Sequence, residues 1–150
     1  MNNKSSTLFF CGLWLVLVAS ALFARPLLPV DETRYLAVAW EMYFNGDYIV
    51  PSLNGEAYSH KPPLLFWLMN LGWHLFGVSS WWAQLVAPSF GLVCLFLTRN
   101  IARYLWPEDH TATALAPVIL IGAAFWTVFT TLTMFDMLVV RVRCLVFWAC

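Results

Sequence analysis

The sequence contains little charge of either sign, and this lack excludes several classes of protein. Only 11% of the 150 residues are Asp, Glu, Lys or Arg, and eight basic residues balance eight acidic ones. The basic residues are scattered along the chain, so no cationic patch for nucleic acid is predicted. The four cysteines show neither a disulfide framework nor the spacing of metal ligands. No nucleotide-binding motif is visible in the sequence.

Hydrophobic residues, in contrast, are abundant. They make up 61% of the chain and aromatic residues 17%, and the mean hydropathy is +0.72. These values lie far outside the range of soluble domains and predict an integral membrane protein. Apolar stretches cover residues 8–24, 62–77, 79–98 and 111–140. We expect an all-α fold with about three membrane spans and short amphipathic helices in the first outer loop.

The first apolar stretch is the expected first span. Its 17 residues are at the lower limit for crossing roughly 30 Å of hydrocarbon. The alternative is a signal peptide that is removed after residue 21, because Ala19-Ser20-Ala21 has the form of a cleavage site. In both cases Lys4 stays on the cytoplasmic side and Asp31 reaches the outer side.

The charge of the loop near residue 100 decides the rest of the layout. Arg99 and Arg103 follow the stretch 79–98, and short arginine-rich loops are cytoplasmic. This loop is cytoplasmic only if residues 62–77 do not cross the membrane. As a helix they reach only about 24 Å, and Asn70 and His74 suit a helix in the interface. We therefore expect a helix that lies on the outer surface.

The last apolar stretch then runs outward as one helix. Asp136 emerges after 25 residues, or about 37 Å of helix, on the same face as Asp31. An acidic residue near the end of an apolar helix is costly unless it meets water or a partner, so Asp136 is a candidate site residue. The alternative is an interfacial residue in contact with lipid headgroups.

The loop between residues 31 and 61 holds five of the eight acidic residues. Asp31 stands where a helix N-cap would, and apolar residues follow at helical spacing as far as Tyr43. Asn45-Gly46 predicts the end of this helix. Residues 47–51 are expected to be extended, and residues 53–56 are expected to form a tight turn.

Lys61 precedes Pro62-Pro63, and the residue before a proline avoids helical geometry. Its ammonium group is therefore expected beside the N-terminus of the following helix. The helix dipole and the unpaired amides there favour an anion, and headgroup depth favours a lipid phosphate. The alternative is a lysine that only reaches toward lipid headgroups.

Three ordered motifs resemble one known family. They are Asp31-Glu32-Thr33-Arg34-Tyr35, residues 45–51 (NGDYIVP) and residues 61–67 (KPPLLFW). Together they look like the N-terminal part of the aminoarabinose transferase and protein-mannosyltransferase-like glycosyltransferases, which have the GT-C fold. The likeness covers about residues 8–138, and the Met-Phe-Asp-Met run around Asp136 fits a further family motif.

The resemblance implies transfer of a sugar from a polyprenyl-phosphate donor to a lipid, glycan or protein acceptor, at the outer face of the plasma (inner) membrane. Family members use the residue that matches Asp31 to engage or activate the acceptor, and the lysine that matches Lys61 to hold the carrier phosphate. Asp136 matches a second important carboxylate. The positions that shape the same cavity match Arg34, Tyr35 and Tyr58. The chemistry is compatible, because a fixed cation stabilises a leaving phosphate and a carboxylate shares the proton of a hydroxyl.

Two features depart from the family pattern. His60 stands where members often have an acidic residue linked to a divalent metal, so a metal at His60 is one interpretation and a hydrogen-bonding histidine is the other. Arg141 and Arg143 interrupt the last apolar stretch. We expect residues 1–140 to be the N-terminal part of a GT-C domain and residues 141–150 an atypical tail of a truncated or out-of-frame product, inactive by itself.

Two other functions compete with a glycosyltransferase. One is a non-catalytic membrane subunit that binds anionic lipid or a partner membrane protein. The other is a transporter, against which the sequence shows no internal repeat and no paired interrupted helices.

Overall fold

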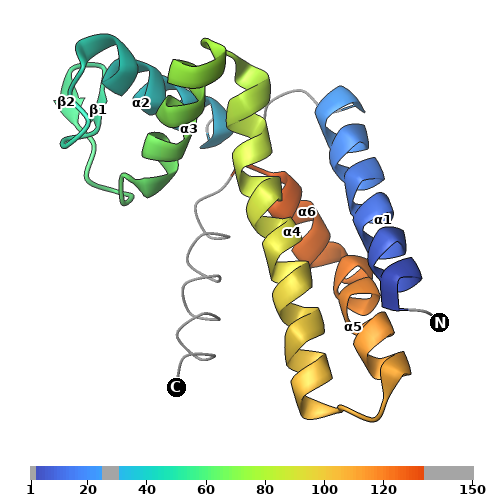
Figure 1. The fold of residues 1–150 in the computed structure, drawn as a ribbon. Helices are drawn as coiled ribbons and strands as arrows, with labels where there is room; N and C mark the ends of the chain where they lie inside the picture. The colour runs from blue at the N-terminus through green and yellow to red at the C-terminus, as the bar shows by residue number, and fades with distance from the viewer. Residues whose placement is uncertain (1–2, 25–30, 134–150) are drawn as a thin grey trace.

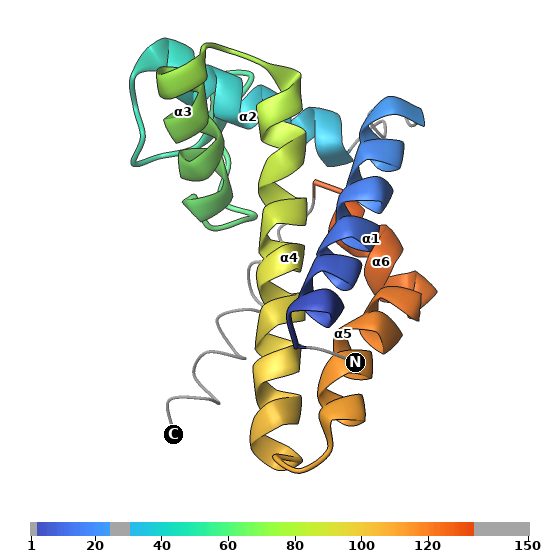
Figure 2. The same ribbon diagram turned by 45° about the vertical axis from the view of Figure 1, so that its right-hand side comes forward.

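The computed structural model describes residues 3–24 and 31–133, and for Asn3, Lys4 and Asp31 it describes the backbone only. In chain order the elements are α1 (Asn3–Ala24), α2 (Asp31–Asn45), β1 (Ser52–Leu53), β2 (Glu56–Ala57), α3 (Leu64–Phe76), α4 (Ser80–Leu105), α5 (His110–Gly122) and α6 (Ala124–Thr131). The long helices α1 and α4 run lengthwise beside α5 and α6 (Figure 1). Helices α2 and α3 and the hairpin gather at the end where α1 finishes and α4 begins (Figure 2).

The expected membrane fold is confirmed. Among the described residues, Ser5–Ala24 and Ser80–Leu105 are long and apolar enough to cross a membrane, and the bent pair α5 and α6 makes a third candidate span. Helix α3 has 13 residues and reaches only about 20 Å, too short for a span. It packs against both α2 and α4. Asn70 on α3 is 2% exposed, so this residue does not face an interface as expected, and the outer-surface position of α3 stays a prediction.

One hydrophobic core joins the lengthwise helices. Its buried residues are Phe10, Trp14, Val18, Leu95 and Ile121. The indole of Trp14 donates a hydrogen bond to the Pro88 carbonyl at 3.2 Å, which links α1 to α4. Toward the far end of the same helices, Arg99 donates to the Thr7 hydroxyl and lies 5.8 Å from the centre of the Phe10 ring. These contacts hold α1 against α4 between Pro88 and Arg99.

The prediction that the last apolar stretch is one continuous helix is wrong. Ala123 has an extended backbone (φ −72°, ψ 97°), and α5 and α6 meet there at an angle of 69°. A break inside a membrane is tolerated only where the freed backbone groups are bonded. The Ala123 amide donates to two carbonyls of α5, and the Thr127 hydroxyl donates to the Ile121 carbonyl. The 37 Å straight path toward residue 136 therefore does not exist.

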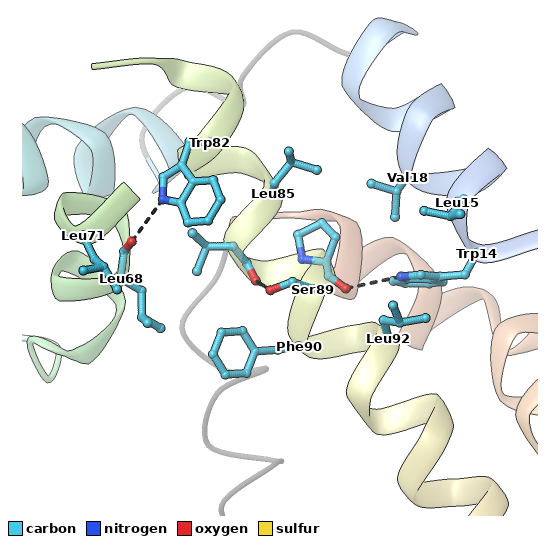
Figure 3. A pocket seen from close by; sticks show the side chains of 12 residues that line it. Trp14, Leu15, Val18, Leu68, Leu71, Trp82, Leu85, Ser89, Phe90 and Leu92 are labelled. Carbon is cyan, nitrogen blue, oxygen red and sulfur yellow. Dashed lines mark hydrogen bonds between the residues drawn. The ribbon is translucent and has the colours of Figure 1, made fainter. Parts of the chain in front are cut away.

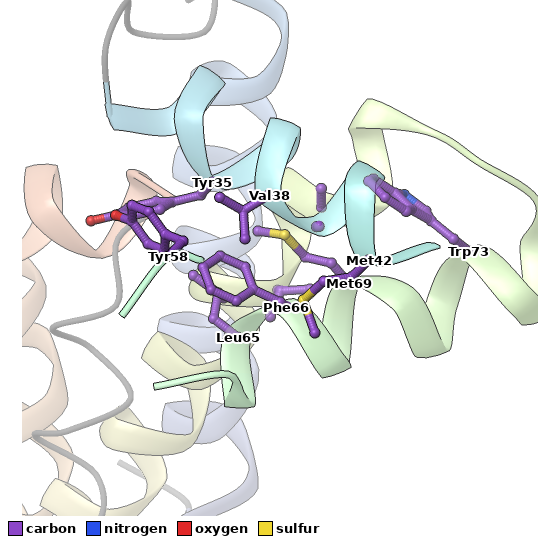
Figure 4. Close-up of a cluster of buried hydrophobic side chains, with 11 residues drawn as sticks. Tyr35, Val38, Met42, Tyr58, Leu65, Phe66, Met69 and Trp73 are labelled. Carbon is purple, nitrogen blue, oxygen red and sulfur yellow. The ribbon is translucent and has the colours of Figure 1, made fainter. Parts of the chain in front are cut away.

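A second core holds α2, the hairpin and α3 together (Figure 4). Its apolar residues are Tyr35, Val38, Ala39, Met42, Tyr58, Leu65, Phe66, Met69, Trp73, Ala83 and Val86. Helix α2 ends where the sequence predicts and begins one residue earlier, at Asp31 itself, and Gly46 follows its last residue with φ 71°. Such a φ suits glycine, because a side chain is strained there. This core gives α2 a fixed position on α3.

The segment between α2 and the hairpin was expected to be extended, but it bends at Ile49 and Val50, and it is attached to α3. The Trp67 indole donates to the Tyr48 carbonyl at 2.6 Å, and the Tyr48 hydroxyl lies 2.8 Å from His74 Nε2. Asp47 accepts from the amides of Ile49 and Val50. The segment is therefore ordered by side chains of α3 and by its own turn.

The expected tight turn joins two short antiparallel strands that the sequence did not predict. Ser52 pairs with Ala57 and Leu53 with Glu56, and the two residues of the turn have positive φ, 56° for Asn54 and 80° for Gly55. Asparagine and glycine are the residues that a two-residue hairpin of this kind prefers. The hairpin leads directly to residues 58–61.

Candidate functional site

The first turn of α2 carries three of the predicted site residues. Asp31 is the first residue of the helix, and its side chain lies outside the description. Arg34 and Tyr35 follow at i+3 and i+4, the spacing that puts residues on one face of a helix. Arg34 is half-buried and Tyr35 is buried. The helix register therefore gathers these three positions at the start of α2.

Tyr35 and Tyr58 come together from distant parts of the chain. Both pack against Phe66 of α3, with ring centres 6.2 and 6.3 Å away. Figure 4 draws both tyrosines at the same edge of the cluster, with their hydroxyl oxygens pointing away from it. The prediction that these two tyrosines shape one cavity stays a prediction, and their proximity supports it.

A small polar pocket of about 270 Å³ opens beside this cluster. Its lining consists of Arg34, Leu53, Glu56, Ala57, Tyr58 and His60. It thus lies between the first turns of α2 and the hairpin. The guanidinium of Arg34 suits an anionic group of a polar ligand, and the Tyr58 phenol and the His60 imidazole can form hydrogen bonds with it, whereas the Glu56 carboxylate offsets part of the positive charge. Glu56 is a lining residue that the sequence reasoning did not single out.

Lys61 stands at the start of α3, as expected. The helix begins at Leu64 with Pro63 as its N-cap, and no side-chain hydrogen bond caps it within the described residues. Lys61 itself is half-buried. The unpaired amides of a helix start and an ammonium group nearby favour an anion at this position.

His60 is exposed and its ring packs edge-on against Tyr58, with 5.3 Å between ring centres. Across residues 3–24 and 31–133, no group of three or more His, Cys, Asp or Glu side chains is placed to hold a metal ion. The side chains of Asp31 and Asp136 are not in that search, so a divalent metal at His60 stays a prediction. The contact with Tyr58 gives His60 a place in the polar pocket without a metal.

Asp136 lies outside the described residues, but the chain just before it is described. Helix α6 ends at Thr131, and the Thr133 amide donates to Glu32 Oε1 at 2.7 Å. Glu32 is fully buried. Sequence reasoning missed this residue, although its spacing to Tyr35 and Ala39 puts it on the buried face of α2. A carboxylate next to Asp31 thus meets the segment that leads to Asp136.

Glu41 is a second carboxylate that the sequence reasoning did not single out. It accepts hydrogen bonds from the backbone amides of Asn54 and Gly55. Partial removal from water raises its pKa, but hydrogen bonds from the Ser52 side chain and from these two amides outweigh that effect and lower the pKa. Glu41 thereby holds the hairpin, and with it Tyr58 and the polar pocket, against α2.

A larger pocket of about 540 Å³ lies between α1, α3 and α4 (Figure 3). Its lining is apolar apart from the Ser89 hydroxyl, which donates to the Val86 carbonyl. The indole of Trp82, at one side, donates to the Leu68 carbonyl at 3.0 Å. With its polar groups already used, this pocket offers no group for acid, base or phosphate chemistry. The polar pocket beside Tyr58 is therefore the candidate site.

The chain was compared with known proteins. No protein-family model matches it. It is 32% identical over 122 residues to the undecaprenyl phosphate-alpha-4-amino-4-deoxy-L-arabinose arabinosyl transferase 2 of Pseudomonas fluorescens. The alignment covers 76% of this chain and 21% of that protein. It is 31% identical over 126 residues to the corresponding transferase of Photorhabdus laumondii, with the same two coverages. The chain thus spans about a fifth of the length of these curated relatives.

Solved structures give the same result. The crystal structure of ArnT from Cupriavidus metallidurans bound to undecaprenyl phosphate is similar with a TM-score of 0.77 and 29% sequence identity, over 91% of this chain and 25% of that one. The apo structure of the same protein has a TM-score of 0.72. In sequence and in fold, the chain is a homologue of the N-terminal part of the ArnT aminoarabinose transferases, which are polytopic membrane proteins of the GT-C fold.

Proposed function

We propose that this chain supplies the phosphate-binding and catalytic part of a glycosyltransferase. The enzyme moves a sugar from a polyprenyl-phosphate donor to a lipid, glycan or protein acceptor at the outer face of the plasma (inner) membrane. The observation that carries the proposal is the gathering of Arg34, Tyr58 and His60 in one polar pocket, with Lys61 next in the chain at an uncapped helix start. The relatives act on an undecaprenyl-phosphate-linked aminosugar, and one of them binds undecaprenyl phosphate.

Lys61 and Arg34 bind the carrier phosphate in this proposal. When the bond between sugar and phosphate breaks, the phosphate leaves with an additional negative charge, which fixed cations stabilise. Asp31 and Asp136 act on the acceptor, where a carboxylate takes the proton of the attacking group. Tyr35 and Tyr58 form the wall of the cavity. A divalent metal held at His60 would add a further positive charge.

The outer-face orientation is supported by the position of the basic end. Arg99 bonds to Thr7 near the start of α1, and Arg103 lies in the last turn of α4. Figure 1 places this end away from α2 and α3. Because arginine-rich short loops stay in the cytoplasm, the end with the polar pocket faces outward.

The phosphate site is tested by measuring the affinity for undecaprenyl phosphate. The protein is expressed from its own gene and reconstituted in nanodiscs. A hydrogen bond to a charged group contributes about 1.5–3 kcal/mol, so Lys61→Ala should weaken binding roughly 10-fold to 150-fold. Lys61→Arg should retain most of it. Arg103→Ala is the matched control, because it removes an exposed cation at the other end of α4.

Transfer is tested with undecaprenyl-phosphate-linked 4-amino-4-deoxy-L-arabinose carrying a labelled sugar, mixed with a cell-envelope fraction. We expect label on a lipid, glycan or protein fraction, and loss of transfer in Asp31→Asn. Normal transfer by both Lys61→Ala and Asp31→Asn would refute the assigned roles. Binding that is equal for any anionic lipid and disappears with salt would instead favour the non-catalytic lipid-binding subunit.

A further inference from the structure

Glu32 makes a long-range contact that the proposed roles do not use. Its carboxylate is fully buried and accepts the backbone amide of Thr133 at 2.7 Å, although 101 residues separate the two in sequence. Thr133 and Thr130 are fully buried as well. The contact therefore joins the first turn of α2 to the end of α6 in a place that water does not reach.

The Thr133 amide needs this acceptor because the helix has already ended. Leu132 has an extended backbone (φ −84°, ψ 144°) and is the C-cap of α6. An amide that has left the helix and is buried must find another acceptor, since an unpaired buried amide costs about 1–3 kcal/mol. Glu32 supplies that acceptor from a different element.

A buried carboxylate is a poor choice if only stability matters. Taking the charge out of water has a large penalty that a hydrogen bond offsets only in good geometry. The neighbours of Glu32 on the same face of α2, Tyr35 and Ala39, show that the face accepts apolar residues. What the Glu32 side chain adds is an oxygen acceptor for a directional hydrogen bond, which fixes where the chain lies at Thr133.

The two aspartates of the proposed site flank this contact. Asp31 precedes Glu32 directly, and Asp136 follows Thr133 by three residues, a stretch that spans at most about 11 Å. A tie between Glu32 and Thr133 therefore limits how far the two carboxylates can separate. Helix α6 runs at 69° to α5, so the direction of α6, and not that of α5, determines where Thr133 lies.

We infer that Glu32 is a positioning residue, which holds the end of α6 against the start of α2 through the Thr133 amide, three residues before Asp136. The effect on catalysis rests on the proposed function. The contact between Glu32 and Thr133 is independent of that function. The inferred role requires neither proton transfer from Glu32 nor contact with substrate. Glu32 acts through the placement of Thr133, from which the chain continues to Asp136.

Three substitutions separate positioning from chemistry. Glu32→Gln keeps an oxygen acceptor at the same reach without the charge. Glu32→Asp keeps the charge but shortens the side chain by one methylene, and Glu32→Ala removes the acceptor. A catalytic carboxylate would tolerate Asp better than Gln, whereas a positioning acceptor tolerates Gln better than Asp. Glu108→Gln is the control, an exposed carboxylate between α4 and α5.

Hydrogen–deuterium exchange tests the contact between Glu32 and Thr133 without any substrate. The protein is expressed from its own gene and reconstituted in nanodiscs. We expect the amides of residues 130–133 to exchange at least 10-fold faster in Glu32→Ala and Glu32→Asp. Glu32→Gln and Glu108→Gln should stay close to the unsubstituted protein. Unchanged exchange in Glu32→Ala overturns the inference. If Glu32→Ala fails to fold, the Gln and Asp variants decide in the same way.

The kinetics of sugar transfer test whether the loss of this contact lowers the rate of catalysis. Misplacement by about 1 Å lowers a rate by roughly 100-fold, so kcat should fall 10-fold to 100-fold in Glu32→Asp while KM for the donor changes less than 3-fold. Glu32→Gln should keep both the rate and the pH profile. A Gln variant as slow as Ala, with an altered pH profile, would show that the carboxylate acts in the reaction. If the unsubstituted protein transfers no sugar, the proposed function fails and the exchange result still decides the contact.

Discussion

Replacing Gly91 by alanine should loosen the point where α1, α4 and α6 cross. A Cβ atom on Gly91 would lie 2.2 Å from Thr130 Cγ2 and 2.7 Å from Trp14 Cζ2. Both distances are far below van der Waals contact, and both neighbours are buried. The helices must therefore separate or the side chains must leave their rotamers. Because Thr130 precedes Thr133 by less than one helical turn, this crossing also places the end of α6 beside Glu32.

The expected size follows from comparison with a second glycine. Overpacking a tight core costs about 1–3 kcal/mol, while Gly→Ala inside a helix gains roughly 1 kcal/mol of helix propensity. Gly12 lies in α1, and no atom that a Cβ there would meet is within 4 Å. Gly12→Ala should therefore be neutral or slightly stabilising. The difference between the two variants isolates the clash, about 1–3 kcal/mol, because the propensity gain is common to both.

The midpoint of thermal unfolding in detergent, followed by tryptophan fluorescence, measures this difference. Gly91→Ala should unfold several degrees below Gly12→Ala. Adding Thr130→Ser to Gly91→Ala removes the Cγ2 atom and should recover part of the loss, with the remainder due to Trp14. Equal midpoints for the two glycine variants would refute the crossing geometry, and so would a double variant no more stable than Gly91→Ala.

Two more predictions concern the hairpin and the link between α1 and α4. The pKa of Glu41 is lowered from its ordinary 4.5, so its hold on the hairpin is fully present above pH 4.5 and is lost as the pH falls through the lowered pKa. Amide exchange at Asn54 and Gly55, corrected for the intrinsic effect of pH, should rise in that range, and Glu41→Gln should abolish this dependence. Trp14→Phe removes the hydrogen bond to Pro88 and should lower the stability by about 1–2 kcal/mol, whereas exposed Trp106→Phe should not change the unfolding midpoint. Equal midpoints for these two tryptophan variants would contradict the role of that bond.

Local signals in the sequence predicted most of the elements between residues 31 and 61. Helix α2 ends at Asn45 as predicted and begins at Asp31, the residue expected to be its N-cap, Asn54-Gly55 forms the expected turn, and Lys61 precedes the start of α3. Each of these features depends on neighbouring residues, such as a glycine with positive φ or a proline that cannot continue a strand. The composition and the lengths of the apolar stretches likewise predicted the membrane fold.

Features that depend on distant neighbours were not predictable in this way. The break at Ala123 was missed because an apolar stretch has the same pattern whether it is straight or bent, and the bend is stabilised by Thr127 and by packing on α4. The burial of Asn70 was missed because it depends on α3 packing between two helices.

The sequence by itself determined the solvent in which this protein folds, the elements between residues 31 and 61 and the residue types available to the polar pocket, because hydropathy and backbone preference are local properties. Tertiary structure alone decided which of these residues meet. It brought Arg34, Tyr58 and His60 into one pocket and gave the buried Glu32 the amide of Thr133 as a partner. Such contacts arise from the packing of whole helices, and no short run of residues carries that information.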